Sequence, residues 1–250
     1  MRFSKIKTLY SRLDLVTFLK YISADAVRRL FLPASRFFFA QGGEDIHILY
    51  LLDNKPDGFY LDIGANQPIR YSNTFKLYLT GWTGILVDAN PHLIKKAAEI
   101  RKKDICVHAL VSNEHRNMDF YISELDLFSS IHSEYAESGD RPDLKLEKIE
   151  LQTVSIDQII EKYVPAGKPI DLLSIDVEGH DFEVLQSLSL LKYRPRLIVI
   201  EDLYYHKTKP ADNKYTQYMS GFNYTLTGAD KQNLYFIRNE EFDYQPGTSG

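Results

Sequence analysis

The sequence predicts an α/β protein with a mostly parallel sheet that closes in an antiparallel hairpin. Short apolar runs alternate with helix-like segments between residues 58 and 111, and the same alternation returns between residues 155 and 201. Strands that alternate with helices are typical of parallel sheets. Two further strand candidates, residues 223–227 and 233–238, flank Gly228-Ala229-Asp230 and predict a terminal β-hairpin.

The first half of the chain supplies three strand candidates separated by helices. The apolar run over residues 58–64 ends in a glycine turn, as buried strands often do. Pro91 is suited to the first turn of the helix that we expect to run to Arg101. The order we predict is helix 44–52, strand 58–64, helix 72–80, strand 84–88, helix 91–101 and strand 105–111.

The alternation is interrupted in the middle of the chain. Residues 118–122 and 149–154 are alternating strand candidates, and the polar stretch 123–147 between them is too long for a simple connection. We interpret that stretch as a substrate-facing loop or lid. The regular order then resumes with helix 155–163, strand 170–176, helix 181–191 and strand 196–201.

The composition is that of a globular chain. Of 250 residues, 44% are hydrophobic and 26% are charged, which suits one large domain or two small ones. The one cysteine, Cys106, excludes an intrachain disulfide. The net charge of −4 argues against a general nucleic-acid binder.

The first 40 residues differ from the rest in charge. They hold eight Lys or Arg and two Asp, a net charge of +6 in a chain whose total is −4. Ile6, Leu9, Leu13, Val16 and Leu19 recur at helical spacing, which predicts a basic amphipathic helix within an extension over residues 1–39. We expect its apolar stripe to pack on the chain's own domain, because most such stripes are core faces. The alternative is that it docks on an anionic membrane or on a partner of glycan assembly.

The beginning of the chain does not resemble a targeting or membrane segment. No run approaches the ~20 apolar residues that span a bilayer, and no small-residue cleavage site follows an apolar core. The sequence therefore predicts a cytoplasmic protein, with peripheral membrane association as the alternative.

Two acids at predicted strand ends indicate a nucleoside-containing ligand. Asp62 precedes the turn at Gly64, and Asp88 ends the second strand. Ligands of open α/β sheets bind beyond the carboxyl ends of the strands, where Asp88 could accept hydrogen bonds from ribose hydroxyls. A dinucleotide would require G-x-G-x-x-G, but only Gly64 is present. S-adenosylmethionine, which has no phosphate, fits better: its ammonium would suit Asp62, and the amides of the turn could bind its carboxylate.

Several motifs, taken together, resemble FkbM-type methyltransferases. They are Ala40-Gln41-Gly42-Gly43-Glu44-Asp45, Leu61-Asp62-Ile63-Gly64-Ala65-Asn66, Ser72-Asn73-Thr74, Gly81-Trp82-Thr83-Gly84-Ile85-Leu86-Val87-Asp88 with Asn90-Pro91, and Ser174-Ile175-Asp176-Val177-Glu178-Gly179. The resemblance runs from about residue 40 to about residue 202. It implies a class I methyltransferase fold with a Rossmann-like sheet over residues 40–245. It also implies methyl transfer from S-adenosylmethionine, most often to an oxygen of a sugar or a natural product.

The cofactor residues we expect combine strand-end positions with the resemblance. Gln41, Glu44, Ser72 and Asn73 are assigned to the pocket wall by resemblance alone. The remaining candidates lie at or after predicted strands: Asp62, Gly64, Ala65, Asn66, Asp88, Ala89, Asn90, Ala109 and Leu110.

A second group of ionisable residues follows the later strands and is the candidate for catalysis. It comprises Asp176, Glu178, His180, Glu201 and Asp202. Methyl transfer to a hydroxyl requires removal of a proton from a poor acid, so a general base or a metal would help. In one version a carboxylate or His180 is the base. In the other, Asp176, Glu201 and Asp202 hold Mg²⁺, an arrangement similar to that of metal-dependent sugar O-methyltransferases. Asp181 is expected only to favour a helix N-terminus.

The acceptor would contact the loop over residues 123–147, with Ser129, Ser130 and His132 as candidates. The leading hypothesis is an O-methyltransferase that acts on a saccharide or similar polyhydroxyl acceptor. Two alternatives stay open at this point. One is a nucleotide-dependent oxidoreductase on a similar sheet, and the other is a non-catalytic scaffold that recruits a glycan-assembly enzyme.

Overall fold

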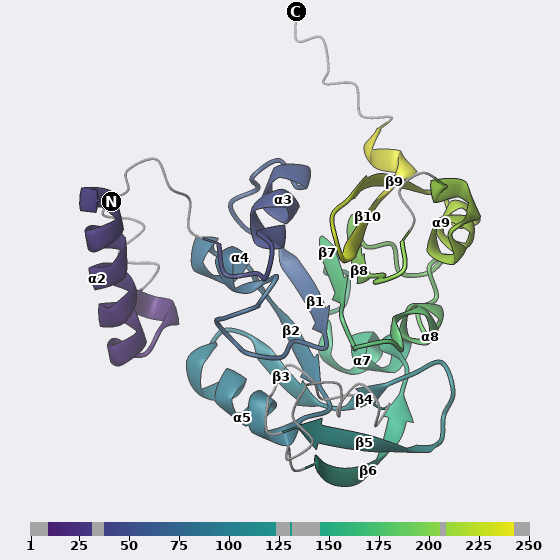
Figure 1. The fold of residues 1–250 in the computed structure, drawn as a ribbon, viewed down its shortest axis with the longest axis horizontal. Helices are drawn as coiled ribbons and strands as arrows, with labels where there is room; N and C mark the ends of the chain where they lie inside the picture. Colours follow the sequence, from purple (N-terminus) through teal and green to yellow (C-terminus); the bar gives the residue numbers. More distant parts are fainter. Residues whose placement is uncertain (1–9, 32–37, 124–130, 132–145, 206–208, 243–250) are drawn as a thin grey trace, which may run out of the picture. The chain divides into compact units, whose positions relative to one another are not determined.

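A computed structural model of the protein describes residues 10–31, 38–123, 131, 146–205 and 209–242. The chain has an α/β fold and divides into two compact units (Figure 1). The N-terminal unit covers Met1–His108 and the C-terminal unit covers Ala109–Gly250. No helix in the described ranges is long and apolar enough to cross a bilayer.

The N-terminal unit contains three parallel strands, as predicted. They are β1 (Phe59–Ile63), β2 (Thr83–Asp88) and β3 (Ile105–His108), in the order β3-β2-β1. Every residue of β1 is buried, which explains why this strand is a continuous apolar run rather than an alternating one. Asp88 ends β2 opposite His108 of β3, so the strand-end acid lies at the carboxyl edge of these strands.

Three helices accompany these strands: α3 (Glu44–Leu51), α4 (Phe75–Thr80) and α5 (Pro91–Ile100). Helix α5 lies along β2 and β3 (Figure 1) and begins at Pro91 as predicted, with Asn90 as its N-cap. Helix α4 begins three residues later than predicted. The reason is local, because the Ser72 hydroxyl accepts hydrogen bonds from the amides of Thr74 and Phe75 and forms a turn before the helix.

The N-terminal segment corrects the expectation of one continuous amphipathic helix. Residues 10–12 are helical, the chain then breaks, and α2 spans Leu15–Phe31. Asp14 causes the break, because its Oδ1 accepts hydrogen bonds from the amides of Val16 and Thr17 and begins a new helix. Leu13 is buried, but Val16 and Leu19 are 59% and 55% exposed, so the predicted stripe is divided between core and surface.

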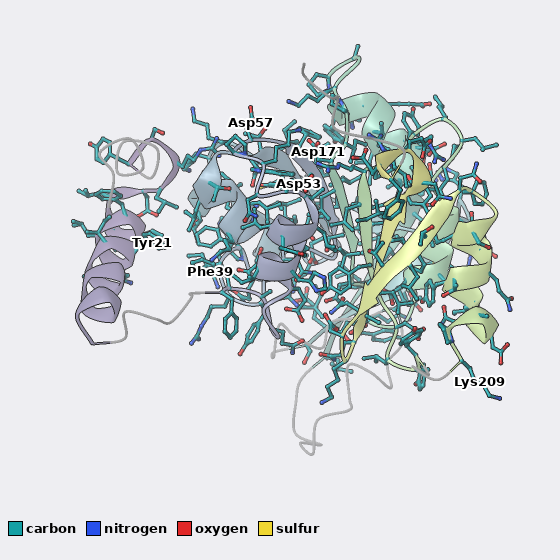
Figure 2. The ribbon with its side chains drawn as sticks, turned by 90° about the horizontal axis from the view of Figure 1, so that it is seen from above. Tyr21, Phe39, Asp53, Asp57, Asp171 and Lys209 are labelled. Atoms are coloured by element: carbon teal, nitrogen blue, oxygen red, sulfur yellow. The ribbon has the colours of Figure 1, made fainter. Side chains whose placement is uncertain are left out.

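A different face of α2 packs on the N-terminal unit. Phe18, Tyr21 and Ile22 pack on a cluster that contains Leu13 and Phe75. The rings of Tyr21 and Phe39, both labelled in Figure 2, stack with centroids 6.3 Å apart. Part of the N-terminal segment thus belongs to the core of its unit.

The main strands of the C-terminal unit confirm the predicted hairpin. Strands β7 (Leu172–Ile175) and β8 (Leu197–Glu201) pair in parallel. Strand β10 (Asn233–Arg238) pairs antiparallel with β8 and with β9 (Tyr224–Ala229), which gives the order β7-β8-β10-β9.

A small second sheet shows where one strand prediction was wrong. Residues 105–111 do not form one strand, because the chain leaves β3 at His108 and forms β4 (Leu110–Val111) elsewhere. Strand β4 joins β6 (Leu146–Val154) and β5 (Asn117–Ser123) in the order β4-β6-β5. The predicted lid is almost entirely outside the described residues, although β6 already begins at Leu146.

The helices of the C-terminal unit agree only in part with the prediction. Helix α7 (Ile156–Tyr163) is confirmed, and Ser155 and Gln158 form its capping box. Helix α8 (Asp181–Gln186) ends five residues earlier than predicted. Helix α9 (Lys214–Ser220) was not predicted, and short 3₁₀ helices occupy Pro210–Asp212 and Asn239–Glu241.

Candidate functional site

The turn after β1 is held by its own backbone amides. The amides of Gly64 and Ala65 both donate to the Val87 carbonyl, at 2.9 and 3.1 Å. Gly64 and Asn66 have positive φ angles of 79° and 49°, so the chain turns sharply. The expectation that the amides of this turn bind the cofactor carboxylate is therefore wrong for Gly64 and Ala65. Each of these amides has one hydrogen, which it already donates to a backbone carbonyl.

Asp88 fixes the two loops that meet at the end of β2. Its Oδ2 accepts from the Asn66 amide and its Oδ1 from the Asn90 amide, both at 2.8 Å. Burial raises the pKa of Asp88 to about 6, against the lowering effect of these two hydrogen bonds. Each carboxylate oxygen has a second lone pair, so Asp88 can still accept hydrogen bonds from a ligand.

Asn90 adds a donor beside Asp88. Its Oδ1 caps α5 by accepting from the His92 amide. Its Nδ2 is buried and has no hydrogen-bond partner among the described residues. A buried amide nitrogen without a partner is costly, which marks this position as one where a ligand acceptor would be favourable.

Asp62 is connected to a buried arginine. Its Oδ2 accepts a 2.6 Å hydrogen bond from the Thr74 hydroxyl, and that hydroxyl accepts from both terminal nitrogens of Arg101. Arg101 also donates to Asp104, Tyr60 and Ser72. This network orients Asp62, and the sequence did not indicate it because its members are scattered over 45 residues.

The other expected cofactor residues are more dispersed. Glu44 is buried at the start of α3 and accepts from the Gly42 amide, whereas Gln41 is exposed. The Ala89 carbonyl lies 2.9 Å from Nε2 of His108. Ser72 is used within the Arg101 network, and Asn73 lies beside it in the same turn. Ala109 directly follows β3, and Leu110 begins β4.

Three carboxylates come together in the C-terminal unit. Asp176 directly follows β7, Asp181 begins α8 and Glu201 ends β8. One oxygen of each lies within 4.8 Å of the other two. Oε2 of Glu201 is buried and has no hydrogen-bond partner among the described residues. The two strand-end acids expected to lie together therefore do so.

The chain after β7 is shaped to hold this cluster. Glu178 and Gly179 have positive φ angles of 56° and 97°. Asp181 closes the turn, because its two oxygens accept from the amides of Val177 and Gly179 at 2.9 and 3.1 Å. Asp181 lies in the first turn of α8, as expected, but its carboxylate accepts from the preceding turn and does not cap the helix.

Burial and mutual repulsion make these acids hard to ionise. Burial raises the pKa of Glu201 to about 8, with Asp181, Glu178 and Asp202 adding repulsion. Burial and the nearby Asp181 raise the pKa of Glu178 to about 7. Burial raises the pKa of Asp181 itself to about 6, against its two backbone hydrogen bonds. The surroundings of these acids therefore favour their neutral, protonated forms in the absence of a bound cation.

Asp202 differs from the expectation that it joins Asp176 and Glu201. Its Oδ1 accepts from the Tyr204 amide at 3.0 Å, and its Oδ2 accepts from Nδ2 of Asn213 at 2.6 Å. The carboxylate thus ties the segment after β8 to the start of α9. The structure places Asp181, not Asp202, as the third acid of the cluster.

His180 is anchored on both sides of its ring. Nε2 lies 3.0 Å from the Ser112 hydroxyl, and Nδ1 lies 3.6 Å from a carboxylate oxygen of Glu183. Its role as a base stays a prediction, as does that of Glu178.

A cavity of about 450 Å³ opens beside the cluster, entirely within the C-terminal unit. Its wall includes Glu201, Asp181 and Asp202 and, on α9 and the segment before it, Lys209, Lys214 and Tyr215. Lys209 is labelled in Figure 2. Sequence reasoning missed these last three because it did not predict α9. The acceptor candidates Ser129, Ser130 and His132 lie outside the described residues.

Comparison with known proteins identifies the family of the chain. The family model described as the methyltransferase FkbM domain matches residues 62–226, which is more than half of the chain and includes Asp62, Asp88, Asp176 and Glu201. No curated protein and no solved structure matches the chain significantly. With that match, and with acids at the carboxyl ends of β1, β2, β7 and β8, the chain belongs to the FkbM methyltransferase domain family.

Proposed function

We propose that the protein is an S-adenosylmethionine-dependent O-methyltransferase that modifies a hydroxyl of a sugar, a polysaccharide or a related natural product. The family match supports methyl transfer. The observation that carries the choice of cofactor is Asp88, a buried carboxylate at the end of the second parallel strand with acceptor capacity to spare.

The residues around Asp88 fit a nucleoside without phosphates. Asp88 can accept from two ribose hydroxyls, and Nδ2 of Asn90, which no described residue pairs, can donate to a ligand oxygen. The amides of Gly64 and Ala65 donate to the Val87 carbonyl, so they are not available to bind a pyrophosphate. When bound, the cofactor supplies a methyl group already activated on a sulfonium, and Asp62 is the nearby acid that suits its ammonium.

The acceptor hydroxyl requires help to lose its proton. A sugar hydroxyl is a weak acid, and a positioned base or a metal lowers that barrier. The candidate groups are Asp176 and Glu201, which belong to the acid cluster, and Glu178 and His180, which lie between Asp176 and Asp181 in the sequence. They support either a carboxylate base or Mg²⁺, the two versions that the sequence left open.

We also propose that the N-terminal part of the chain contacts an anionic membrane surface. The charge of +6 on residues 1–40 is complementary to anionic lipid, and Leu15, Val16 and Leu19 expose an apolar face of α2. No residue of the acid cluster lies in this segment, so docking and chemistry can be tested separately.

Calorimetry with S-adenosylmethionine and S-adenosylhomocysteine tests the proposed function. We expect both to bind, and we expect methyl transfer from labelled cofactor to members of a polyhydroxyl acceptor library. Absence of binding by either compound at sub-millimolar concentration would overturn the proposal. Binding without transfer to any acceptor would favour a non-catalytic role.

A further inference from the structure

We propose that Asp176, Asp181 and Glu201 form a binding site for a divalent cation that prefers oxygen ligands, such as Mg²⁺ or Mn²⁺. The site differs from the sequence-based set, because Asp181 replaces Asp202. The catalytic use of the ion rests on the proposed methyl transfer, but its binding can be measured without any reaction.

The geometry of the three acids suits one ion. They come from three elements, the end of β7, the start of α8 and the end of β8. One oxygen of each lies within 4.8 Å of the others. Oxygens bound to a single cation with bond lengths of ~2.0–2.6 Å stand roughly 3–5 Å apart. The three ligand atoms therefore need at most small side-chain rotations to share an ion.

A second observation points to a missing partner. Glu201 is only 6% exposed, and its Oε2 has no hydrogen-bond partner among the described residues. Neither Glu201 nor Asp181 forms an ion pair with any residue that the structure describes. A buried carboxylate without a partner is strongly unfavourable, and buried charges in proteins are paired or coordinate metals. A cation between the three acids would satisfy Oε2 and balance the charge.

The neighbouring backbone holds the site open for an ion. Asp181 is fixed by the amides of Val177 and Gly179, so its carboxylate is oriented before any ligand arrives. Glu201 and Asp181 also line the cavity of about 450 Å³, which gives the ion a route from solvent and room for water and acceptor. Asp202 is not one of the three grouped acids, and its oxygens accept from the Tyr204 amide and from Nδ2 of Asn213.

The ion has a defined use in the proposed reaction. A hydroxyl bound to a divalent cation is more acidic. Its proton would leave to solvent through the cavity, and the oxygen would form the new bond to the methyl carbon while the carbon–sulfur bond breaks with its electron pair on sulfur. No oxidant or reductant is required.

Manganese binding to the full chain tests the site. After treatment with EDTA and its removal, the protein is titrated with Mn²⁺, and the free ion is followed by electron paramagnetic resonance. We expect one Mn²⁺ per chain, displaced by Mg²⁺. Asp181→Asn and Glu201→Gln should each weaken Mn²⁺ binding roughly tenfold or more. The control is Glu161→Gln, which changes an exposed acid on α7 of the same unit but outside the cluster and should leave the affinity unchanged.

Asp202→Asn distinguishes the two ligand sets. We expect it to retain Mn²⁺ affinity, and a loss equal to that of Glu201→Gln would overturn the choice of Asp181 over Asp202. Thermal unfolding with and without Mn²⁺ separates loss of the ion site from loss of the fold. The ion should raise the Tm of wild type but should leave the Tm of Glu201→Gln unchanged. Wild type that binds no Mn²⁺ at millimolar concentration overturns the site.

Cofactor calorimetry on the same samples separates this proposal from the proposed function. If S-adenosylhomocysteine binds and transfer continues fully in EDTA, the catalytic use of the ion is overturned and the methyltransferase proposal stands. If Mn²⁺ binds at Asp181 and Glu201 but neither cofactor form binds, the metal site is supported and the proposed function fails.

Discussion

Asp88 controls two properties of the N-terminal unit, and they respond to pH with opposite signs. Burial raises the pKa of its carboxyl to about 6, with repulsion from Asp62 and attraction to His108 as smaller effects. Ribose hydroxyls need the ionised form as acceptor, so we expect cofactor affinity to fall as the pH drops below about 6. The contribution of Asp88 to the free energy of unfolding has the opposite pH dependence. Because the pKa is raised in the folded state, this contribution is largest below the pKa of an unfolded Asp, ~3.9. It is lost as the pH rises through the folded-state pKa of about 6.

Calorimetry with S-adenosylhomocysteine between pH 5 and 8 measures the first effect. Asp88→Asn should bind roughly 10- to 100-fold more weakly at neutral pH, since hydrogen bonds to a charged group contribute ~1.5–3 kcal/mol, and its affinity should lose the pH dependence. Asp57→Asn is a suitable control, because Asp57 is an exposed acid of the same unit (Figure 2). A variant at Asp88 that binds like wild type would contradict the placement of the cofactor.

Gly84 is required by the packing of Tyr60. The two residues are paired across β1 and β2, and a Cβ at position 84 would overlap the ring and the carbonyl oxygen of Tyr60. Tyr60 has little freedom to move, because its hydroxyl donates to Asp104 and accepts from Arg101. We expect Gly84→Ala to destabilise the protein by about 3 kcal/mol or more, as measured by urea unfolding.

Gly167→Ala separates steric overlap from the general effect of replacing glycine. Gly167 has a φ of 74°, but no atom lies within 4 Å of a Cβ built there. Gly167→Ala should lower the free energy of unfolding by only ~1–2 kcal/mol, the penalty for a side chain in the left-handed conformation. Equal losses for the two variants would mean that the contact with Tyr60 relaxes.

At the scale of elements, Arg12 anchors the N-terminal segment to the end of α4. Its guanidinium donates to the carbonyls of Tyr78, Gly81 and Trp82, which follow or end that helix. It also lies 5.1 Å from the centroid of the Tyr78 ring. One of the eight basic residues of the first 40 therefore has a structural role and is not available to a partner.

We expect Arg12→Met to destabilise the N-terminal unit by about 2 kcal/mol and to increase hydrogen exchange in α2. Arg12→Lys should recover only part of the loss, because an ammonium lacks the planar fork that reaches three carbonyls. Lys20→Met, an exposed basic residue on α2, serves as the control. Exchange in α2 that does not change would show that Phe18, Tyr21 and Ile22 hold the helix without Arg12.

Elements with a strong local signal were predictable from the sequence, and those decided by distant contacts were not. The apolar runs of β1 and β8 and the proline at the start of α5 place their elements within a few residues. The division of residues 105–111 depends on pairing of β4 with β6, some 40 residues later. The third acid of the cluster differs from the expected one for the same reason, since Asp202 binds Asn213 of a segment that showed no helical signal.

At the scale of the whole molecule, charge and apolar exposure coincide in the first 40 residues. This segment has a net charge of +6, whereas the remainder of the chain is strongly acidic. Leu15, Val16 and Leu19 are 55–60% exposed on α2, while Phe18 and Ile22 of the same helix pack against the core cluster. A helix that buries one apolar face and exposes another beside basic residues matches the chemistry of an anionic membrane surface, which offers both negative headgroups and an apolar interior.

We therefore expect the full chain to float with vesicles that contain phosphatidylserine, and not with vesicles of phosphatidylcholine alone. High salt should weaken the association, because it screens the attraction between the basic segment and the headgroups. Replacing Leu15, Val16 and Leu19 together by Ser should abolish flotation without changing cofactor binding. Tyr50→Ser is the control, since Tyr50 is also exposed but lies on α3. If the serine variant floats like wild type, or if the same substitutions instead convert a dimer to a monomer in sedimentation, the exposed face of α2 serves a purpose other than membrane docking.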